Sequence, residues 1–327
     1  MVSQPRAPRV VLVGERAPNG ITGSFARAFR SCGWEVVELR WGPWRPGALA
    51  VALFRAPSLA GGFRRQLRRR VAAAGAAELV LVVKGPFLDA RTIDWMRTRT
   101  GAPVVCWNPD DPLGPALSNQ GGIARAVPAY DTYVVWADDV AERLAARAAR
   151  VEVIPFGFDP WLHHPPRDRS AAEGRVVFVG AWDPEREAVM RSIAHHAPVV
   201  FGDGWPSGLP FETRPAAFGE DLCAALGGAA WSINLLRPQN RRSHNMRSFE
   251  IPACGGVQLA VRTADHERHL AGTPCVLVES EEDFDGVLKG EPPVGVVQPG
   301  WLEANRYEAR IRQLLRALGL EQGGGGA

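Results

Sequence analysis

Short apolar runs that alternate with helical stretches constrain the fold of this chain more than any other feature. The first half contains these runs: Arg9–Val13, Trp34–Leu39, Leu79–Val83, Val104–Trp107, Thr132–Val135 and Val151–Ile154. A strand that is apolar on both faces is typical of a parallel sheet covered by helices on both sides. The pattern therefore predicts an α/β fold with a doubly wound sheet.

A segment rich in proline and glycine, 155–166, interrupts the alternation and is predicted to be a linker. A second series of apolar runs follows: Val176–Val179, Val199–Phe201, Trp231–Leu235, Gly256–Ala260 and Cys275–Val278. Two Rossmann-like doubly wound domains are expected, facing each other across a cleft that binds the ligand. The expected division is 1–155, 156–300, a C-terminal helix in 301–320 (Leu302 to Leu318) and a flexible tail, 321–327.

Positive charge is concentrated in one segment, although the formal net charge of the whole chain is only +3. Residues 39–77 contain no acid and these arginines: Arg40, Arg45, Arg55, Arg64, Arg65, Arg68, Arg69 and Arg70. This segment carries +8, so the rest of the chain carries 3 − 8 = −5. The basic excess thus belongs to the first domain.

The centre of this basic segment, Ser58 to Ala74, is predicted to be a helix. Its apolar stripe consists of Leu59, Phe63, Leu67 and Val71, so the arginines should point away from the core. One interpretation is a solvated arginine face. The other, favoured by Trp41, Trp44 and Phe54 nearby, is docking of anionic lipid headgroups or of an anionic acceptor. Nucleic acid is a weaker option, because no nucleic-acid fold signature occurs.

The composition indicates a globular protein and excludes a disordered, collagen-like or coiled-coil chain. No apolar run approaches the roughly 20 residues of a membrane span, and Met1 to Arg9 lacks the apolar core of a signal peptide. The five cysteines are scattered without a C-x-x-C pair, which favours buried reduced thiols. We expect a cytoplasmic protein, with peripheral attachment to the inner membrane face as an option.

Two loops of the first domain are candidate sites because each follows a predicted strand. The loop from Gly14 to Gly23 contains Gly20 and Thr22 before a helix, where backbone N–H groups could hold a phosphate. Its spacing fits neither G-x-G-x-x-G nor a P-loop, so a plain tight turn is the alternative. Asp110 and Asp111 suit a general base or a contact to an acceptor hydroxyl. Their alternative role is an Asp-Pro turn.

The most informative stretch of the second domain is Arg237 to Gly256. A polar loop with three arginines precedes a predicted helix, Met246 to Cys254. Cations around the start of a helix suit a phosphate or diphosphate, and Glu250 could accept hydrogen bonds from sugar hydroxyls. The alternative is a solvated basic loop.

This stretch also resembles a known family. Asn245 to Gly256 is similar to the N-x-R-x-F-E-x-x-A-C-G signature of the CgeB-like family, named after a spore-maturation protein, whose C-terminal domain is glycosyltransferase group 1-like. Pro155–Asp159 with His164-Pro165 resembles the interdomain linker of GT-B glycosyltransferases. Further similar elements are Phe178–Trp182 with Arg186, Phe201–Trp205 and Trp107–Pro112, so the resemblance covers most of the chain.

The resemblance implies a GT-B glycosyltransferase with an acceptor-binding N-terminal domain and a nucleotide-sugar-binding C-terminal domain. The last helix is expected to pack back on the first domain. The resemblance implies that Glu250 binds the ribose of the donor and that Asn245 and Arg247 bind its diphosphate. It also places Gly180 and Arg186 in a loop that faces the phosphates, and Asp203 and Trp205 beside the nucleobase. Asp110 and Asp111 are expected to face the acceptor.

One departure concerns the E-x7-E motif of many retaining relatives. The position of its first glutamate is Arg242, so donor-sugar recognition and stereochemistry stay open. His244 is expected to be solvated, with a donor contact as the alternative.

The expected reaction moves a hexose from a nucleoside-diphosphate sugar, with UDP- or dTDP-sugars favoured, to an acceptor hydroxyl. The donor half lacks an Asp-x-Asp motif, so no metal and no cofactor are expected. Arg186, Arg247 and the helix N-terminus would stabilise the leaving diphosphate, and Asp110 or Asp111 would orient or deprotonate the acceptor. The alternatives are a nucleotide-sugar 2-epimerase and a catalytically degenerate sugar-binding protein.

Overall fold

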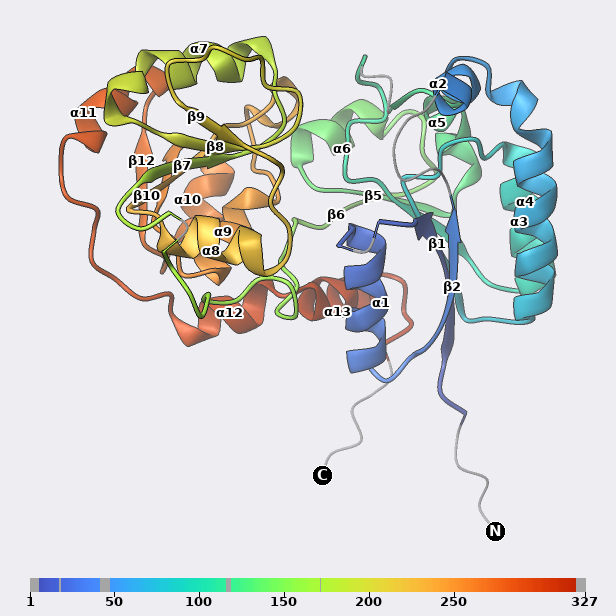
Figure 1. Cartoon of the computed structure of the whole chain (residues 1–327). Helices are drawn as coiled ribbons and strands as arrows, with labels where there is room; N and C mark the ends of the chain where they lie inside the picture. The colour runs from blue at the N-terminus through green and yellow to red at the C-terminus, as the bar shows by residue number, and fades with distance from the viewer. Residues whose placement is uncertain (1–5, 18, 42–47, 116–118, 171, 322–327) are drawn as a thin grey trace, which may run out of the picture. The chain divides into compact units, whose positions relative to one another are not determined.

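The chain forms two compact units in a computed structural model that describes residues 6–17, 19–41, 48–115, 119–170 and 172–321 (Figure 1). The first unit is Met1–Pro155 with Tyr307–Ala327, and the second is Phe156–Arg306. Some positions singled out in the sequence lie outside the described residues: Pro18 of the glycine-rich loop, Trp44, Arg45 and the tail from Gln322 onward.

The sheet of the first unit has six parallel strands in the order β2-β1-β3-β4-β5-β6. Their bounds are β1 Arg9–Glu15, β2 Glu35–Trp41, β3 Leu79–Val83, β4 Val104–Trp107, β5 Thr132–Val135 and β6 Val151–Val153. Every described residue of β3, β4 and β5 is buried, as the continuous apolar runs predict.

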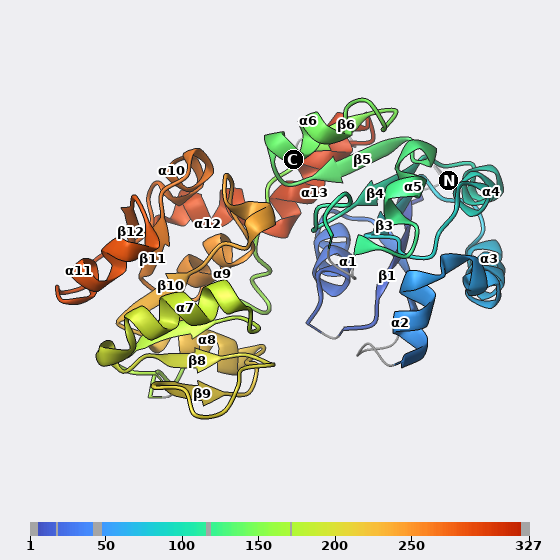
Figure 2. The same cartoon turned by 90° about the horizontal axis from the view of Figure 1, so that it is seen from above.

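Helices cover both faces of this sheet. They are α1 Ile21–Ser31, α2 Ala48–Arg55, α3 Gly61–Ala74, α4 Ala90–Thr100, α5 Ile123–Ala126, α6 Asp138–Leu144 and α13 Tyr307–Ala317. α1 and α13 lie on one face, and α3 and α4 lie on the other (Figure 2). Phe25 of α1 packs against Trp107 and against Tyr307 of α13, with ring centroids 4.6 and 5.2 Å apart.

The sheet of the second unit also has six parallel strands, in the order β12-β11-β10-β7-β8-β9. The strands are β7 Val176–Val179, β8 Val199–Phe201, β9 Glu212–Arg214, β10 Trp231–Asn234, β11 Gln258–Val261 and β12 Cys275–Val278. The helices are α7 Pro184–Ser192, α8 Glu220–Gly228, α9 Arg247–Ala253, α10 Ala264–Leu270, α11 Phe284–Leu288 and α12 Pro299–Asn305. The α/β class with two doubly wound sheets is confirmed. The edge strand β9 was not predicted, because its Glu-Thr-Arg sequence is largely exposed and has no apolar run.

The prediction of one helix from Leu302 to Leu318 is wrong. Arg306 has an extended backbone (φ −68°, ψ 155°), which separates α12 from α13. It also pairs with Phe158 in an isolated parallel bridge, and Phe158 stacks on Trp301 at 6.0 Å. The chain thus leaves the second unit at Arg306, and α13 belongs to the first.

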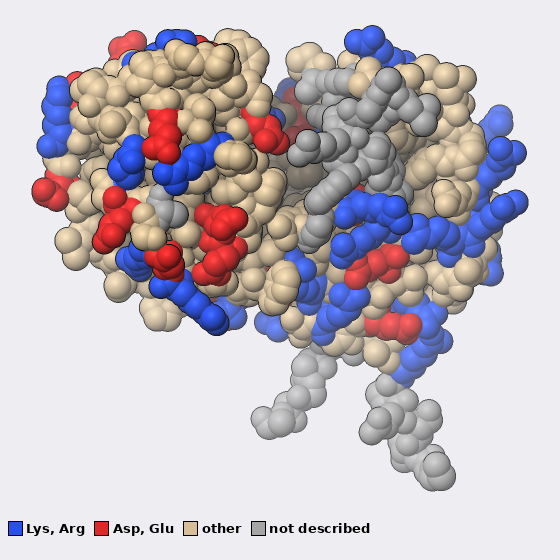
Figure 3. All heavy atoms as spheres, viewed as in Figure 1, with Lys and Arg blue, Asp and Glu red and all other residues tan. Residues whose placement is uncertain are grey.

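Two arginines of the basic helix, Arg64 and Arg68, form hydrogen bonds within the protein that the sequence did not predict. A 3-10 turn, Pro57–Ala60, precedes α3, and Leu59 is 69% exposed, so its assignment to the buried stripe is wrong. Arg64 donates to the carbonyls of Pro57 and Phe87 at 2.9 and 3.0 Å. Arg68 donates to Thr92 Oγ1 at 3.2 Å. The solvated interpretation holds for Arg65 and Arg69, which are exposed. Figure 3 shows basic side chains gathered on the edge of the first unit where α3 runs.

Among the described helices, none is both long and apolar enough to cross a membrane. All five cysteines are free, and three of them, Cys106, Cys223 and Cys254, are buried.

Candidate functional site

Two glycine turns meet at the carboxyl ends of β7 and β8, the edge of a parallel sheet where ligands bind. A Cβ atom on Gly202 would lie 1.9 Å from the carbonyl oxygen of Gly180, so only glycine fits there. The indole N–H of Trp205 donates to the same oxygen at 2.9 Å, and its ring packs edge-on against Phe178 and Phe211. Trp205 therefore supports the loop of Gly180, while the neighbouring Asp203 is exposed.

Arg186 places a largely buried positive charge beside these turns. Asp183 caps α7 by accepting the Arg186 N–H at 3.0 Å. The guanidinium donates to the carbonyls of Ala181 and Leu235 at 3.0 and 3.3 Å. Burial, together with repulsion from Arg237 and Arg247, lowers the pKa of Arg186 to about 10. The group stays charged at neutral pH in a region of excess positive charge, which favours an anionic ligand.

α9 brings Arg247 to the same region. Its guanidinium donates to the carbonyl of Val179, the last residue of β7, at 3.3 Å and to the carboxylate of Glu250. Glu250 is only 4% exposed. Arg186 and Arg247 are thus held at the end of β7 by backbone carbonyls, and Glu250 lies one helical turn further on.

His163 was missed in the sequence and completes this group. Its Nε2 lies 3.6 Å from Glu250 Oε1, and its Nδ1 accepts from the backbone N–H of Asp159 at 3.2 Å. Nε2 therefore carries the proton and faces the carboxylate. Burial lowers the pKa of His163, so the ring is neutral at pH 7. The available signal was its place beside His164 in the linker motif, but only the fold brings it to Glu250.

Asn245 is engaged within the protein. Its Oδ1 accepts the N–H of Ser248 at 3.1 Å, and its Nδ2 donates to Asn234 Oδ1 at 2.8 Å. The side chain thereby fastens the start of α9 to the end of β10. This is a positioning role next to Arg247, and it leaves both polar atoms of the amide occupied by protein.

His244 is fully buried, so the prediction of a solvated side chain is wrong. Its Nε2 accepts the N–H of Phe156 at 3.3 Å, and its Nδ1 lies 2.9 Å from Asp265 Oδ2. Both ring nitrogens face protein atoms, which removes the basis for a donor contact. Burial opposes ionisation of Asp265, but hydrogen bonds from His244 and Ser243 lower the pKa of that carboxyl to about 2.

In the first unit, Asp110 and Asp111 have different surroundings. Asp110 forms an ion pair with Lys84 and is half-buried. Asp111 is buried, pairs with Arg143 at 2.6 Å and accepts the N–H of Leu113 at 2.9 Å. Asp111 therefore has the turn role, and Asp110 is the better candidate for contact with an acceptor.

The glycine-rich loop is occupied by a carboxylate of the protein itself. Glu15 accepts from the backbone N–H of Thr22 at 3.1 Å and from its hydroxyl. A Cβ on Gly20 would lie 2.3 Å from Glu15 Oε1. The structure favours the tight-turn interpretation of Gly20 and Thr22 over the phosphate loop, because Glu15 already fills the N-terminus of α1.

Two groups of side chains in the second unit have the composition of metal ligands: His195, His196 and Asp285, and His244, Asp265 and His269. Neither includes Arg186, Arg247 or Glu250. His244 fits poorly as a ligand, because its Nδ1 proton faces Asp265 when Nε2 accepts from Phe156.

Residues 185–293 match a family described as glycosyl transferase-like, and this range includes Arg186, Arg247 and Glu250. A comparison with curated protein sequences finds no match. Among solved structures, AviGT4, a glycosyltransferase involved in avilamycin A biosynthesis, is similar over 94% of this chain and 96% of its own, with 14% identity and a TM-score of 0.63.

Two further structures resemble the whole chain. An α,α-trehalose-phosphate synthase (UDP-forming) from Burkholderia xenovorans, in complex with glucose-6-phosphate, has 11% identity and a TM-score of 0.61 over 95% of this chain and 100% of its own. The UDP-GlcNAc 2-epimerase from Methanocaldococcus jannaschii has 8% identity and a TM-score of 0.51 over 94% and 99%. These likenesses concern the fold alone. They give the chain a GT-B-like fold, while the similarity to the glycosyl transferase-like family concerns residues 185–293 of the second unit.

Proposed function

We propose that this protein transfers a hexose from a nucleoside-diphosphate sugar, with UDP- or dTDP-sugars favoured, to an acceptor hydroxyl. The observation that carries the proposal is the pair Arg186 and Arg247, held at the end of β7 beside the Gly180 turn. The glycosyl transferase-like match covers both arginines. The similarity of Asn245 to Gly256 to the CgeB-like signature supports membership of that family.

The leaving diphosphate gains negative charge as the bond to the sugar breaks. Arg186 and Arg247 would stabilise that charge, and because backbone carbonyls already fix both side chains, little reorganisation is needed. Glu250, oriented by Arg247 and faced by the Nε2 proton of His163, has a carboxylate suited to accept the ribose hydroxyls. This assigns Glu250 to donor binding and His163 to its positioning.

The acceptor would bind in the first unit. Asp110 is the residue we assign to the acceptor hydroxyl, because Asp111 is committed to Arg143 and to Leu113. The ion pair with the Lys84 ammonium fixes the carboxylate of Asp110, which suits a group that orients the acceptor.

Binding of UDP, dTDP and GDP, measured by calorimetry and by the shift in melting temperature, tests the donor assignment. A ligand that binds only the native state raises the melting temperature, by an amount that grows with its concentration. We expect UDP or dTDP to bind and Arg247→Ala to weaken that binding. Equal affinity of the wild type and Arg247→Ala would contradict the assignment.

A nucleotide-sugar 2-epimerase is the second candidate, supported by the likeness in fold to the enzyme from Methanocaldococcus jannaschii. The discriminating measurement is turnover of the nucleotide-sugar with no acceptor present. Epimerised nucleotide-sugar favours the epimerase, whereas release of nucleoside diphosphate that depends on an acceptor favours the transferase. Binding without turnover over an acceptor panel would indicate a degenerate sugar-binding protein.

A further inference from the structure

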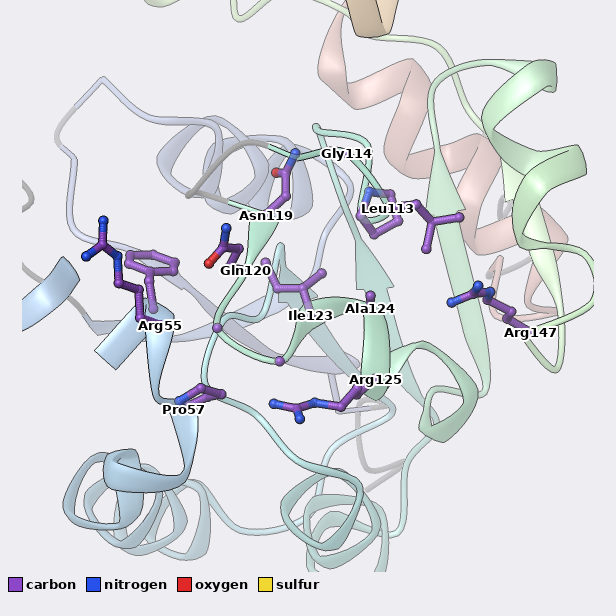
Figure 4. A pocket seen from close by; sticks show the side chains of 14 residues that line it. Arg55, Pro57, Leu113, Gly114, Asn119, Gln120, Ile123, Ala124, Arg125 and Arg147 are labelled. Carbon is purple, nitrogen blue, oxygen red and sulfur yellow. The ribbon is translucent and has the colours of Figure 1, made fainter. Parts of the chain in front are cut away.

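A cavity of about 500 Å³ lies wholly within the first unit (Figure 4). It is bordered by the end of α2, by the turn after β4 and by the residues around α5. This volume lies in the range of small-molecule sites. The turn, Pro112 to Gly114, directly follows Asp110 and Asp111, so the cavity adjoins the carboxyl end of β4.

The charged side chains that line this cavity are all positive. Arg55, Arg125 and Arg147 line it, and no aspartate or glutamate does. Figure 4 shows the three side chains on different sides of the cavity. All three are exposed, and no ion pair with a described carboxylate is found for any of them. By contrast, Arg64 in the same unit is paired with Asp89 at 3.2 Å. Three arginines without acids favour an oxyanion.

The wall of the cavity also holds a buried hydrogen-bond acceptor without a partner among the described residues. Asn119 lines it and is 4% exposed, yet its Oδ1 has no hydrogen-bond partner among the described residues. A buried acceptor of this kind is costly unless a ligand or water donates to it. A hydroxyl group is the donor that suits it. The site thus combines cations for an anion with an acceptor for a hydroxyl.

The backbone two residues after Asn119 is held by hydrogen bonds, which favours a formed site over a chance hollow. Gly121, at φ +69°, donates to the carbonyl of Phe54 at 2.9 Å and accepts from the N–H of Phe87 at 2.8 Å. A Cβ on Gly114 would lie 3.1 Å from Asn119 Nδ2, so the two residues pack closely.

We infer that this cavity binds the phosphate-bearing part of a small hydroxylated acceptor. The inference rests on the proposed function, because it assigns the acceptor side of the same reaction. The arginines attract the phosphate, Asn119 accepts from a hydroxyl, and the acceptor lies next to the turn that follows Asp110 and Asp111. The acceptor is thus a phosphate ester of sugar size.

Isothermal titration calorimetry with a hexose 6-phosphate, glycerol 3-phosphate and inorganic phosphate tests this inference. The proteins compared are the wild type, Arg125→Gln, Arg147→Gln and the double variant, each checked for an unchanged circular dichroism spectrum. We expect a phosphate ester to bind the wild type, and each single variant to bind it about tenfold or more weakly. Arg69→Gln is the matched control: it removes an exposed arginine of the same unit outside the cavity and keeps the wild-type affinity.

Two further arms separate the possible sources of binding. Arg247→Ala should still bind the ester, whereas loss of ester binding in this variant but not in the double variant would place the anion in the second unit and overturn the inference. Binding of phosphatidylglycerol vesicles alone, without any soluble ester, would also overturn it. The inference is also overturned if the wild type binds no phosphate ester, or if the double variant binds the ester with the wild-type affinity.

UDP titrations of the same proteins keep the two hypotheses apart. If the protein binds the ester through Arg125 and Arg147 but binds no nucleotide, the proposed transferase function is contradicted and only an anion-binding site remains. If the protein binds nucleotide but no ester, only the inferred acceptor site is contradicted.

Discussion

The half-buried cations at the end of β7, Arg186 and Arg247, are the residues on which catalysis would depend. Arg186 and Arg247 are fixed by the carbonyls of Ala181, Leu235 and Val179, and each also has one carboxylate partner, Asp183 and Glu250 respectively. A charge that is already oriented and partly desolvated acts strongly on a developing anion. Burial and, after it, repulsion from Arg237 and Arg247 lower the pKa of Arg186, and a bound anion would relieve that repulsion.

At this scale, Arg247→Ala is expected to lower kcat/KM by about 10²-fold, because one cation facing the leaving diphosphate is lost. Release of nucleoside diphosphate measures the effect. Arg191→Ala is a matched control, since Arg191 also pairs with a glutamate of its own helix, Glu187, at 2.8 Å but lies exposed on α7. A loss below threefold in Arg247→Ala would rule out its catalytic role.

At the scale of elements, the site depends on how closely loops and helices approach. The turns after β7 and β8 touch through Gly180 and Gly202. α9 and α10 are joined by Ser248 and His266, whose Oγ and Nε2 lie 3.0 Å apart. His266 Nδ1 also donates to the carbonyl of Val261 at 2.7 Å, so the neutral ring is fully bonded. The helix that carries Arg247 is thereby held to its neighbour.

Gly202→Ala is expected to destabilise the second unit by about 1–3 kcal/mol, because the added methyl group cannot fit against the Gly180 carbonyl. The variant should also bind UDP more weakly, since the Gly180 turn has to move. Chemical unfolding and calorimetry measure the two effects. Gly286→Ala in α11 is the control, because its Cβ would meet no atom within 4 Å. Equal stability of both variants would refute the close contact.

The acid sensitivity of the second unit should depend on His266. Burial lowers the pKa of His266 to about 4, whereas an unfolded histidine titrates near 6.5. Between these values the unfolded chain binds more protons, so stability falls as the pH falls, by about 3 kcal/mol from this group between pH 7 and pH 4. In His266→Gln this part of the loss should vanish, as measured by urea unfolding at several pH values. Parallel profiles of the variant and the wild type would contradict the assignment.

At the scale of the whole molecule, the C-terminal segment completes the first unit. Tyr307, Ile311 and Leu314 of α13 are buried in the core formed with α1 and the first sheet. The first unit is therefore built from both ends of the chain, while residues 156–306 form the second. Loss of α13 would expose this core without touching Arg186 or Arg247.

Ile311→Ala is accordingly expected to destabilise the first unit by about 2–5 kcal/mol through the cavity that it leaves. Affinity for UDP, measured below the unfolding transition, should stay at the wild-type value. Arg312→Ala, on the exposed side of α13, is the control for stability. A matching loss of nucleotide affinity in Ile311→Ala would mean that the donor site depends on α13.

The sequence by itself determined the two doubly wound sheets, because strands buried on both faces need continuous apolar runs, and these are visible along the chain. It also located Arg247 and Glu250, whose spacing places them on one helical turn. The short edge strand β9 and the break at Arg306 could not be predicted, since neither leaves a periodic apolar pattern.

Only the tertiary structure decided which polar residues are available to a ligand. Glu15 fills the N-terminus of α1 from seven residues before Thr22, whereas Asp265 engages His244 and Arg143 engages Asp111 across 21 and 32 residues of chain. His163 reaches Glu250 across 87 residues of chain, from 163 to 250. Hydrogen bonds and ion pairs depend on distances of about 3 Å between groups that folding brings together, and no local pattern records them.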